Sequence, residues 1–157
     1  MKKILTFLVL MIIAPVVFIA LSSSTQPEPG RGKSLDKVSI FIRYVTNNNE
    51  KKLSMNDSNG ESAYNDLKTR VHAGGTITWK LDQFSGIVSI DNIYTEDKKS
   101  EIFKNKAIKS KGGKQFTLQI PAGLTGEVKY IIEFNVNGKK RIKIDPYIKV
   151  VPPDDKE

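Results

Sequence analysis

Short stretches in which hydrophobic and polar residues alternate dominate the chain after residue 37. The clearest lies in Val71–Asp82, where Ile77, Trp79 and Leu81 alternate with polar side chains behind the Gly74-Gly75 pair. A period of two residues is typical of a strand with one buried face. This strand carries the single Trp of the chain, so we predict that its inward face lies at the centre of the core.

Turn-forming residues divide much of the remaining chain into further short strands. Ile87, Ile90 and Ile93 are three residues apart, which predicts a bulged or irregular strand. Asn137-Gly138 is a strong hairpin signal, and Pro146 must interrupt pairing because it has no N–H to donate. The other predicted strands are Val38–Thr46, Leu67–His72, Ile87–Thr95, Lys114–Ile120, Glu127–Val136, Lys139–Ile144 and Tyr147–Val151.

Two polar segments show weaker patterns. In Asn47–Asp66 we predict a short edge strand around Lys52–Met55, followed by a turn at Asn56–Gly60. In the segment 96–114, Ile102 and Phe103 are expected to insert into the core.

Seven to nine short strands and no long helix predict an all-β fold, a single antiparallel β-sandwich over residues 38–151. Residues 152–157 form a short tail. A length of 114 residues is enough for one hydrophobic core.

The first 37 residues have a different character. A basic head, Met1–Lys3, precedes the uncharged apolar run Ile4–Leu21, which is the layout of an export signal. We predict that residues 1–22 are a cleaved signal peptide or a retained membrane anchor, since about 20 apolar residues span a bilayer. Residues 23–37, rich in Pro and Gly, are a predicted linker. Either alternative places the sandwich in the periplasm, on the cell surface or in the medium, with membrane contact through Ile4–Leu21 if that segment is uncleaved.

Charge supplies the main lead to a partner. The chain has a formal charge of +8, and 23 basic against 17 acidic residues remain without Lys2 and Lys3. Clustered Lys and Arg favour anionic surroundings, so we predict binding of an envelope component, either an anionic polymer or lipid head groups, while solubility alone is the competing explanation. Nucleic acid is disfavoured for an exported chain. The candidate residues are Lys98, Lys99, Lys104, Lys106, Lys109, Lys111, Lys114, Lys139, Lys140 and Arg141.

Several stretches together resemble the cupredoxins of plastocyanin type. They are Gly75–Trp79, the strand and corner Lys114–Gly123, the Tyr-bearing stretch Gly126–Tyr130 and the last strand Tyr147–Val150. The resemblance implies a cupredoxin-like sandwich, and an immunoglobulin-like sandwich is the alternative topology. A cupredoxin copper site needs a Cys thiolate and two His. The chain has no Cys and one His, so the resemblance carries over no copper ligand, and we predict no metal or other cofactor.

Enzymatic chemistry has little support in the sequence. His72, the sole His, lies in a predicted strand, and we interpret it as structural. The motif Asp57–Gly60 resembles part of a calcium loop, but Met55 stands where the first oxygen ligand belongs. Glu133 is the acid to examine for a carboxylate pair, against the simpler interpretation of an outward residue on a solvated sheet face.

These observations lead to three functional hypotheses. The first is a non-enzymatic interaction or accessory module of the cell envelope with a preference for anionic surfaces. The second is a small-ligand or carbohydrate-binding module that uses Trp79, Tyr94 or Tyr147. The third, an enzyme with a carboxylate-only site, is the least supported.

Overall fold

Two layers of strands pack face to face. The computed structural model describes residues 34–47, 50–136 and 141–153. The strands of this described part are β1 Lys37–Asn47, β2 Glu50–Asp57, β3 Ser62–Tyr64, β4 Lys68–His72, β5 Thr76–Leu81, β6 Ser89–Tyr94, β7 Ile108–Lys109, β8 Gln115–Gln119, β9 Gly126–Lys129, β10 Ile131–Asn135, β11 Ile142–Ile144 and β12 Tyr147–Val151. A single 3-10 turn in the same part, η1, spans Glu101–Phe103.

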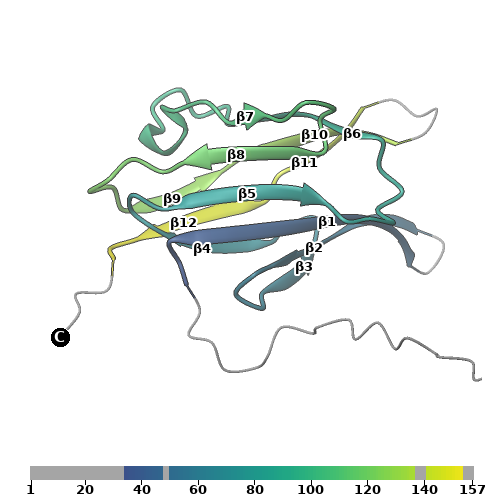
Figure 1. Cartoon of the computed structure of the whole chain (residues 1–157), viewed down its shortest axis with the longest axis horizontal. Coiled ribbons are helices and arrows are strands. Elements are labelled where there is room, and N and C mark those ends of the chain that lie inside the picture. The colour runs from purple at the N-terminus through teal and green to yellow at the C-terminus, as the bar shows by residue number, and fades with distance from the viewer. Residues whose placement is uncertain (1–33, 48–49, 137–140, 154–157) are drawn as a thin grey trace, which may run out of the picture. The chain divides into compact units, whose positions relative to one another are not determined.

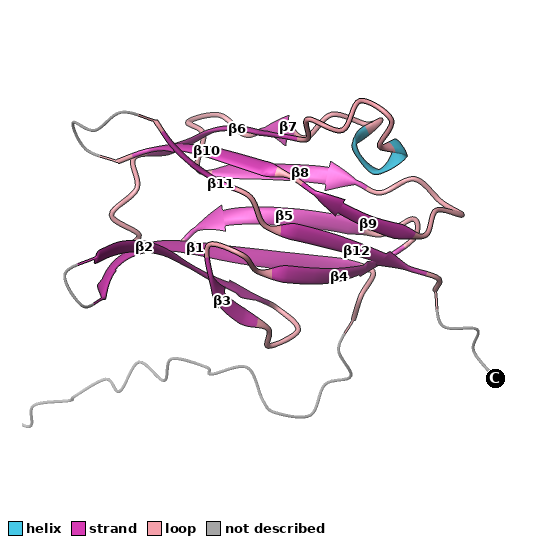
Figure 2. Ribbon diagram, turned by 180° about the vertical axis from the view of Figure 1, so that it is seen from behind, coloured by secondary structure: helices cyan, strands magenta, loops and turns pink. Residues whose placement is uncertain are grey.

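One layer is a six-stranded sheet in the order β3-β2-β1-β5-β8-β7. The other consists of two three-stranded sheets, β11-β10-β6 and β4-β12-β9. Figures 1 and 2 show these layers from opposite sides. The predicted all-β sandwich is therefore confirmed.

Two strand pairs run parallel, which differs from a purely antiparallel sandwich. β1 pairs with β5 in parallel, and β4 pairs with β12 in the same way. The reason lies in the path of the chain, which leaves the first layer after β3, forms β4 in the second, and returns to lay β5 beside β1. The stretch Val71–Asp82 thus joins the two layers.

The turn between β4 and β5 requires glycine. Gly74 has a φ of 79°, a conformation that residues with a Cβ rarely adopt. At Gly75 an added Cβ would lie 2.9 Å from the carbonyl oxygen of His72 and 3.0 Å from that of Asp36. The return to the first layer therefore depends on the Gly pair.

The predicted strand Glu127–Val136 is divided at Tyr130 into β9 and β10. Opposite it, Pro146 separates β11 from β12, and the Tyr130 amide donates to the Pro146 carbonyl at 3.0 Å. This interrupted hairpin contributes to both small sheets, while Val128, Tyr130 and Ile132 keep pointing into the core. The hairpin pairing is confirmed by β10 and β11; the Asn137-Gly138 turn itself lies outside the described residues.

The prediction of an edge strand around Lys52–Met55 is wrong in one respect. β2 is eight residues long and lies between β1 and β3, so β3 forms the edge. Leu53 and Met55 are buried in the core, which explains how so polar a segment joins the sheet. The predicted turn follows, with the Asp57 carboxylate accepting from the amides of Asn59 and Glu61.

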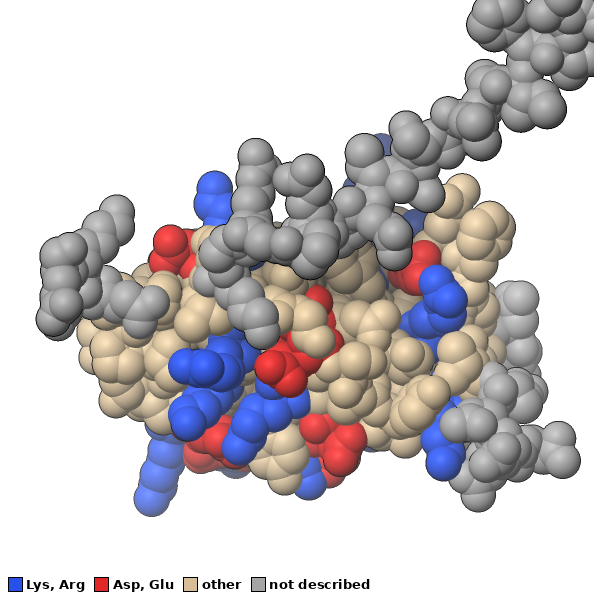
Figure 3. Space-filling view, turned by 90° about the horizontal axis from the view of Figure 1, so that it is seen from below, with Lys and Arg blue, Asp and Glu red and all other residues tan. Residues whose placement is uncertain are grey.

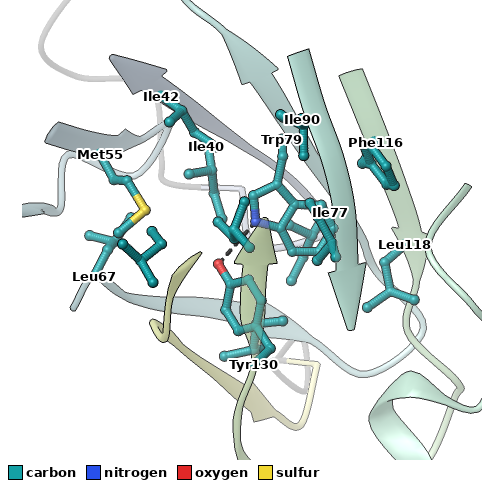
Figure 4. Close-up of a cluster of buried hydrophobic side chains, with 14 of the residues drawn as sticks. Ile40, Ile42, Met55, Leu67, Ile77, Trp79, Ile90, Phe116, Leu118 and Tyr130 are labelled. Atoms are coloured by element: carbon teal, nitrogen blue, oxygen red, sulfur yellow. Dashed lines mark hydrogen bonds between the residues drawn. The ribbon is translucent and has the colours of Figure 1, made fainter. Parts of the chain in front are cut away.

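Trp79 lies at the centre of the core, as predicted, with no exposed surface. Figure 4 shows its indole facing Tyr130 from the other layer. The Trp79 Nε1 donates to the Tyr130 hydroxyl at 2.9 Å, and the ring centroids are 5.5 Å apart. Ile102 is buried and Phe103 packs 5.9 Å from the Tyr130 ring, which confirms that both insert into the core.

The predicted signal or anchor, residues 1–22, and residues 23–33 of the linker lie outside the described part. At the start of that part, the Leu35 carbonyl accepts from the His72 amide and the Asp36 carbonyl from the Thr76 amide. Within residues 34–47, 50–136 and 141–153, no helix is long and apolar enough to cross a membrane.

Candidate functional site

An open depression of about 540 Å³ lies between β6 and the segment that contains η1. We call it the Tyr94 depression. Its lining includes the apolar and aromatic residues Ile93, Tyr94, Phe103 and Ala107, and the polar or charged residues Asn92, Asp97, Lys98, Glu101, Lys104 and Lys106. Eight of the twelve lining residues are polar or charged, so the depression is more polar than the usual site for an apolar small ligand.

Local hydrogen bonds shape the loop that borders the depression. Thr95 Oγ1 donates to the Lys129 carbonyl at 2.9 Å and accepts from the Asp97 amide at 3.1 Å. The Asp97 carboxylate accepts from the Lys99 amide at 3.0 Å. Ile102 fixes the far side of the loop because its side chain is buried.

Eight of the ten basic residues predicted from sequence are described by the structure, and they fall into three groups. Lys98, Lys104 and Lys106 line the Tyr94 depression, where Lys104 also pairs with Glu101 at 3.1 Å. Lys99, Lys111 and Lys114 are exposed outside its lining.

Lys109 and Arg141, from the two separate basic stretches, meet at Asp91. Lys109 Nζ donates to the Asp91 carbonyl at 3.3 Å, and Arg141 Nε lies 3.3 Å from the Asp91 carboxylate. Lys139 and Lys140 lie outside the described residues. Charges of both signs are interspersed on the face shown in Figure 3.

The sequence analysis gave an outward, solvent-exposed position as the simpler interpretation of Glu133, and the exposure part of that interpretation is wrong. Glu133 points away from the core, yet it is only 7% exposed. Its carboxylate accepts from Lys143 Nζ at 2.9 Å and from the Tyr94 hydroxyl at 3.1 Å, with Arg141 at 3.8 Å. The hydrogen bond from Lys143, above all, lowers the pKa of Glu133 despite its burial, and Glu133 in turn raises the pKa of Lys143.

A β-bulge brings Asp91 into this cluster. The register between β6 and β10 shifts at Glu133, so that Asn92 faces Glu133 and Ile90 faces Phe134. The extra residue, Asp91, thereby reaches Arg141 at 3.3 Å. The spacing of Ile87, Ile90 and Ile93 predicted an irregular strand here. The sequence did not show that Lys143 would bind Glu133 or that Asp91 would bind Arg141.

The three aromatic candidates have different surroundings. Trp79 is buried, which excludes it from a binding surface. Tyr147 is half-buried, with Lys68 and Lys129 ammonium groups 6.0 and 5.6 Å from its ring centre. Tyr94 is the one of these three that lines the depression of about 540 Å³.

His72 is buried, and its Nδ1 lies 2.9 Å from the Asp36 carboxylate. Among the described residues, no three His, Cys, Asp or Glu side chains gather so that they could hold a metal ion.

Comparisons with known proteins add little. No protein-family model matches the chain, and no curated protein matches it. Among solved structures, it is similar to a Bacteroides ovatus mixed-linkage glucan utilization locus protein, SGBP-B, in complex with a mixed-linkage heptasaccharide. The match has 12% identity and a TM-score of 0.29, and it covers 71% of this chain and 35% of that one. Because a likeness at this level carries no functional argument, the site is interpreted from its own geometry.

Proposed function

We propose that the chain is an exported, non-enzymatic module of the cell envelope that binds an anionic saccharide in the Tyr94 depression. One observation carries this proposal: two aromatic residues, Tyr94 and Phe103, and three predicted basic residues line the same open depression. The hypotheses of anionic preference and of carbohydrate binding therefore converge on one place.

The chemistry of the walls suits such a ligand. The apolar face of a sugar ring packs on aromatic side chains, and its hydroxyl groups bond to amides and carboxylates such as those of Asn92, Asp97 and Glu101. Lys98, Lys104 and Lys106 would attract a carboxylate or phosphate group on the saccharide. Acyclic lipid head groups, such as phosphoglycerol, share the negative charge but offer no ring to the aromatic residues, so we favour a saccharide over such lipids.

The location in the envelope rests on the predicted export segment, residues 1–22. The hydrogen bond from Lys143 holds the pKa of Glu133 below its usual value, which opposes a general-acid role for this one residue.

The test is titration calorimetry of the full chain in a non-ionic detergent. The probes are hexagalacturonate, which carries carboxylates, and cellohexaose, a neutral oligosaccharide of the same length. We expect tighter binding of hexagalacturonate. High salt should weaken this preference, because the screening length falls from about 10 Å at 0.1 M to about 3 Å at 1 M.

A pair of matched triple variants separates the site from overall charge. Changing Lys98, Lys104 and Lys106 to Gln should weaken hexagalacturonate binding about tenfold or more, at about 1.4 kcal/mol per factor of ten. The control changes Lys99, Lys111 and Lys114 to Gln, which removes the same charge outside the depression, and it should bind almost as wild type. Equal losses in both variants, or no binding of either probe by the wild type, would contradict the proposal. Anionic vesicles that bind equally well in both variants would point to lipid head groups instead.

A further inference from the structure

The two layers of the sandwich present different side chains to the outside. On β5 and β8, buried core residues alternate with outward ones. The outward residues form three directly opposite pairs, Thr76 with Gln119, Thr78 with Thr117, and Lys80 with Gln115. Five of these six side chains carry a hydroxyl or amide group. On the second layer, the exposed outward positions of β4 and β12 are instead basic, at Lys68, Arg70 and Lys149.

The uncharged character continues across β1, β2 and β3, where two aromatic residues are added. Phe41 lies between two buried residues of β1 and is 42% exposed, and Tyr64 on β3 is 49% exposed. Between them on β2, Ser54 lies opposite Tyr64 and Asn56 lies opposite Phe41. We call this outward side of the six-stranded sheet the Phe41–Tyr64 face; its strands follow one another from β7 to β3 in Figure 1.

Strand spacing sets the separation of the two aromatic residues. Phe41 shares a row with Asn56 and Ser62, and Tyr64 lies two residues beyond Ser62 on β3. With about 4.8 Å between strands and about 3.4 Å per residue, the Cα atoms of Phe41 and Tyr64 are about 12 Å apart. This distance is close to the length of a disaccharide unit, so one polysaccharide chain that crosses the strands can contact both aromatic residues.

Several hydroxyl groups of this face are available to a ligand. Ser54, Thr78 and Thr117 make no side-chain hydrogen bond within the part of the chain that the structure describes. A hydroxyl group both donates and accepts, which matches the hydroxyl groups of a sugar. Their present partner is water, which a saccharide can replace without leaving these groups unpaired.

Charged side chains on this face are few, and two of them are engaged. Arg43 Nε donates to the Asp82 carboxylate at 2.9 Å. Lys80 Nζ lies 5.9 Å from the ring centre of Phe41, a distance that suits a cation–π contact. A polyanion therefore finds less free charge here than among the lysines of the Tyr94 depression. A protein partner usually buries an apolar centre, and this face offers hydroxyl and amide groups there instead.

We propose that the Phe41–Tyr64 face is a second binding surface, which takes an uncharged polysaccharide chain lying across β1, β2 and β3. Phe41 and Tyr64 pack against the apolar faces of sugar rings, and Ser54 and Asn56 bond to the sugar hydroxyl groups between them. This surface shares no residue with the lining of the Tyr94 depression, and it does not depend on the anionic saccharide proposed there.

The test is titration calorimetry of the full chain in a sugar-free, non-ionic detergent. The probes are two uncharged polysaccharides, hydroxyethylcellulose and dextran. Phe41→Ala and Tyr64→Ala each remove one aromatic residue from the face, and Phe84→Ala, at a side chain 81% exposed in the loop after β5, is their control. Ser54→Ala removes one hydroxyl group, with Ser34→Ala at another exposed position as its control. Blue-shifted Trp79 emission verifies that each variant is folded.

We expect the wild type to bind at least one of the two polysaccharides. Phe41→Ala and Tyr64→Ala should each weaken that binding about threefold to tenfold, which is the effect of losing one aromatic contact. Ser54→Ala should weaken it about threefold through the loss of one hydrogen bond. Phe84→Ala and Ser34→Ala should bind as the wild type does.

Hexagalacturonate separates this inference from the proposed function. Its affinity should fall when Lys98, Lys104 and Lys106 are changed to Gln, and it should stay unchanged in Phe41→Ala and Tyr64→Ala. The affinity for the uncharged polysaccharide should show the reverse pattern. If hexagalacturonate does not bind at all, the proposed function fails, and the two uncharged polysaccharides still decide whether the Phe41–Tyr64 face is a binding surface.

The inference is overturned if the wild type binds neither hydroxyethylcellulose nor dextran. Equal affinities of Phe41→Ala and Phe84→Ala would overturn it too. Loss of polysaccharide binding in the triple lysine variant would place the ligand in the Tyr94 depression instead. A loss of hexagalacturonate binding alone in Phe41→Ala and Tyr64→Ala would show that the face takes an anionic ligand, against the proposal.

Discussion

The indole of Trp79 and the phenol of Tyr130 join the two layers of the sandwich through a hydrogen bond of 2.9 Å. Both side chains have no exposed surface, so neither polar atom has access to water. Burial raises the pKa of the Tyr130 hydroxyl, which stays protonated. A buried polar group without a hydrogen-bond partner is costly. Here the indole N–H of Trp79 and the hydroxyl oxygen of Tyr130 are each other's partner.

We expect Trp79→Phe to destabilise the protein by about 1–3 kcal/mol from the unpaired Tyr130 hydroxyl, in addition to the loss of packing. Tyr130→Phe should have a comparable effect by leaving the indole N–H unpaired. The double variant should lose less than the sum, because it leaves no orphaned group. Urea unfolding measures these differences. Phe84→Ala, at a side chain that is 81% exposed, is the control and should stay within about 0.5 kcal/mol of wild type.

Trp79 fluorescence should be blue-shifted and should not change when hexagalacturonate or cellohexaose is added. The physical reason is its complete burial, with Tyr130 as its hydrogen-bond partner. Emission spectra with and without each oligosaccharide provide the measurement. A saccharide-dependent shift would mean that binding reorganises the core, against a site confined to the Tyr94 depression.

Gly75→Ala should destabilise the fold by more than about 1 kcal/mol, because its Cβ would meet three backbone oxygens, those of His72, Asp36 and Leu35, at 2.9–3.1 Å. The control is Gly123→Asn, since Gly123 has a φ of 74° with no atom within 4 Å of an added Cβ, and Asn tolerates this conformation. Thermal unfolding of both variants gives the comparison. Equal midpoints for Gly75→Ala and wild type would contradict the tight packing of this turn.

The lowered pKa of Glu133 makes a prediction about pH. A carboxyl group whose pKa is lower in the folded state contributes stability above its unfolded pKa, and that contribution is lost as the pH falls through the folded value. Below about pH 4.5, the reference value for Glu, the wild type should therefore lose stability more steeply than Glu133→Gln. Urea midpoints across this range test the prediction, and parallel curves for the two proteins would refute it.

Much of the fold was predictable from local pattern. Strands β4, β5, β8 and β12 lie within the predicted ranges, and the buried positions of Trp79 and Phe116 follow from alternation. Alternation is a property of neighbouring residues, and it survives in any sheet that has one buried face. The division of Glu127–Val136 at Tyr130 could not be predicted from alternation, because the buried positions keep their period of two on both sides of the break.

The pairing of Glu133 with Lys143 depends on the register between β10 and β11, which local sequence pattern does not give. A two-residue turn at Asn137-Gly138 would place Ile142 opposite Glu133, whereas the observed register places Lys143 there. A shift of one residue exchanges the two faces of a strand. The Glu133 cluster therefore depends on a register that is set by packing along the whole hairpin.

The sequence by itself determined the all-β class, the Trp79 core, the absence of Cys and of a copper ligand set, and the candidate basic residues. The tertiary structure alone decided the parallel pairs, the position of Tyr94 beside the depression, and which lysines line that depression. The physical reason is the range of the interactions. Alternation and turn chemistry act between residues a few positions apart, whereas a depression is formed by segments that meet only when the layers pack.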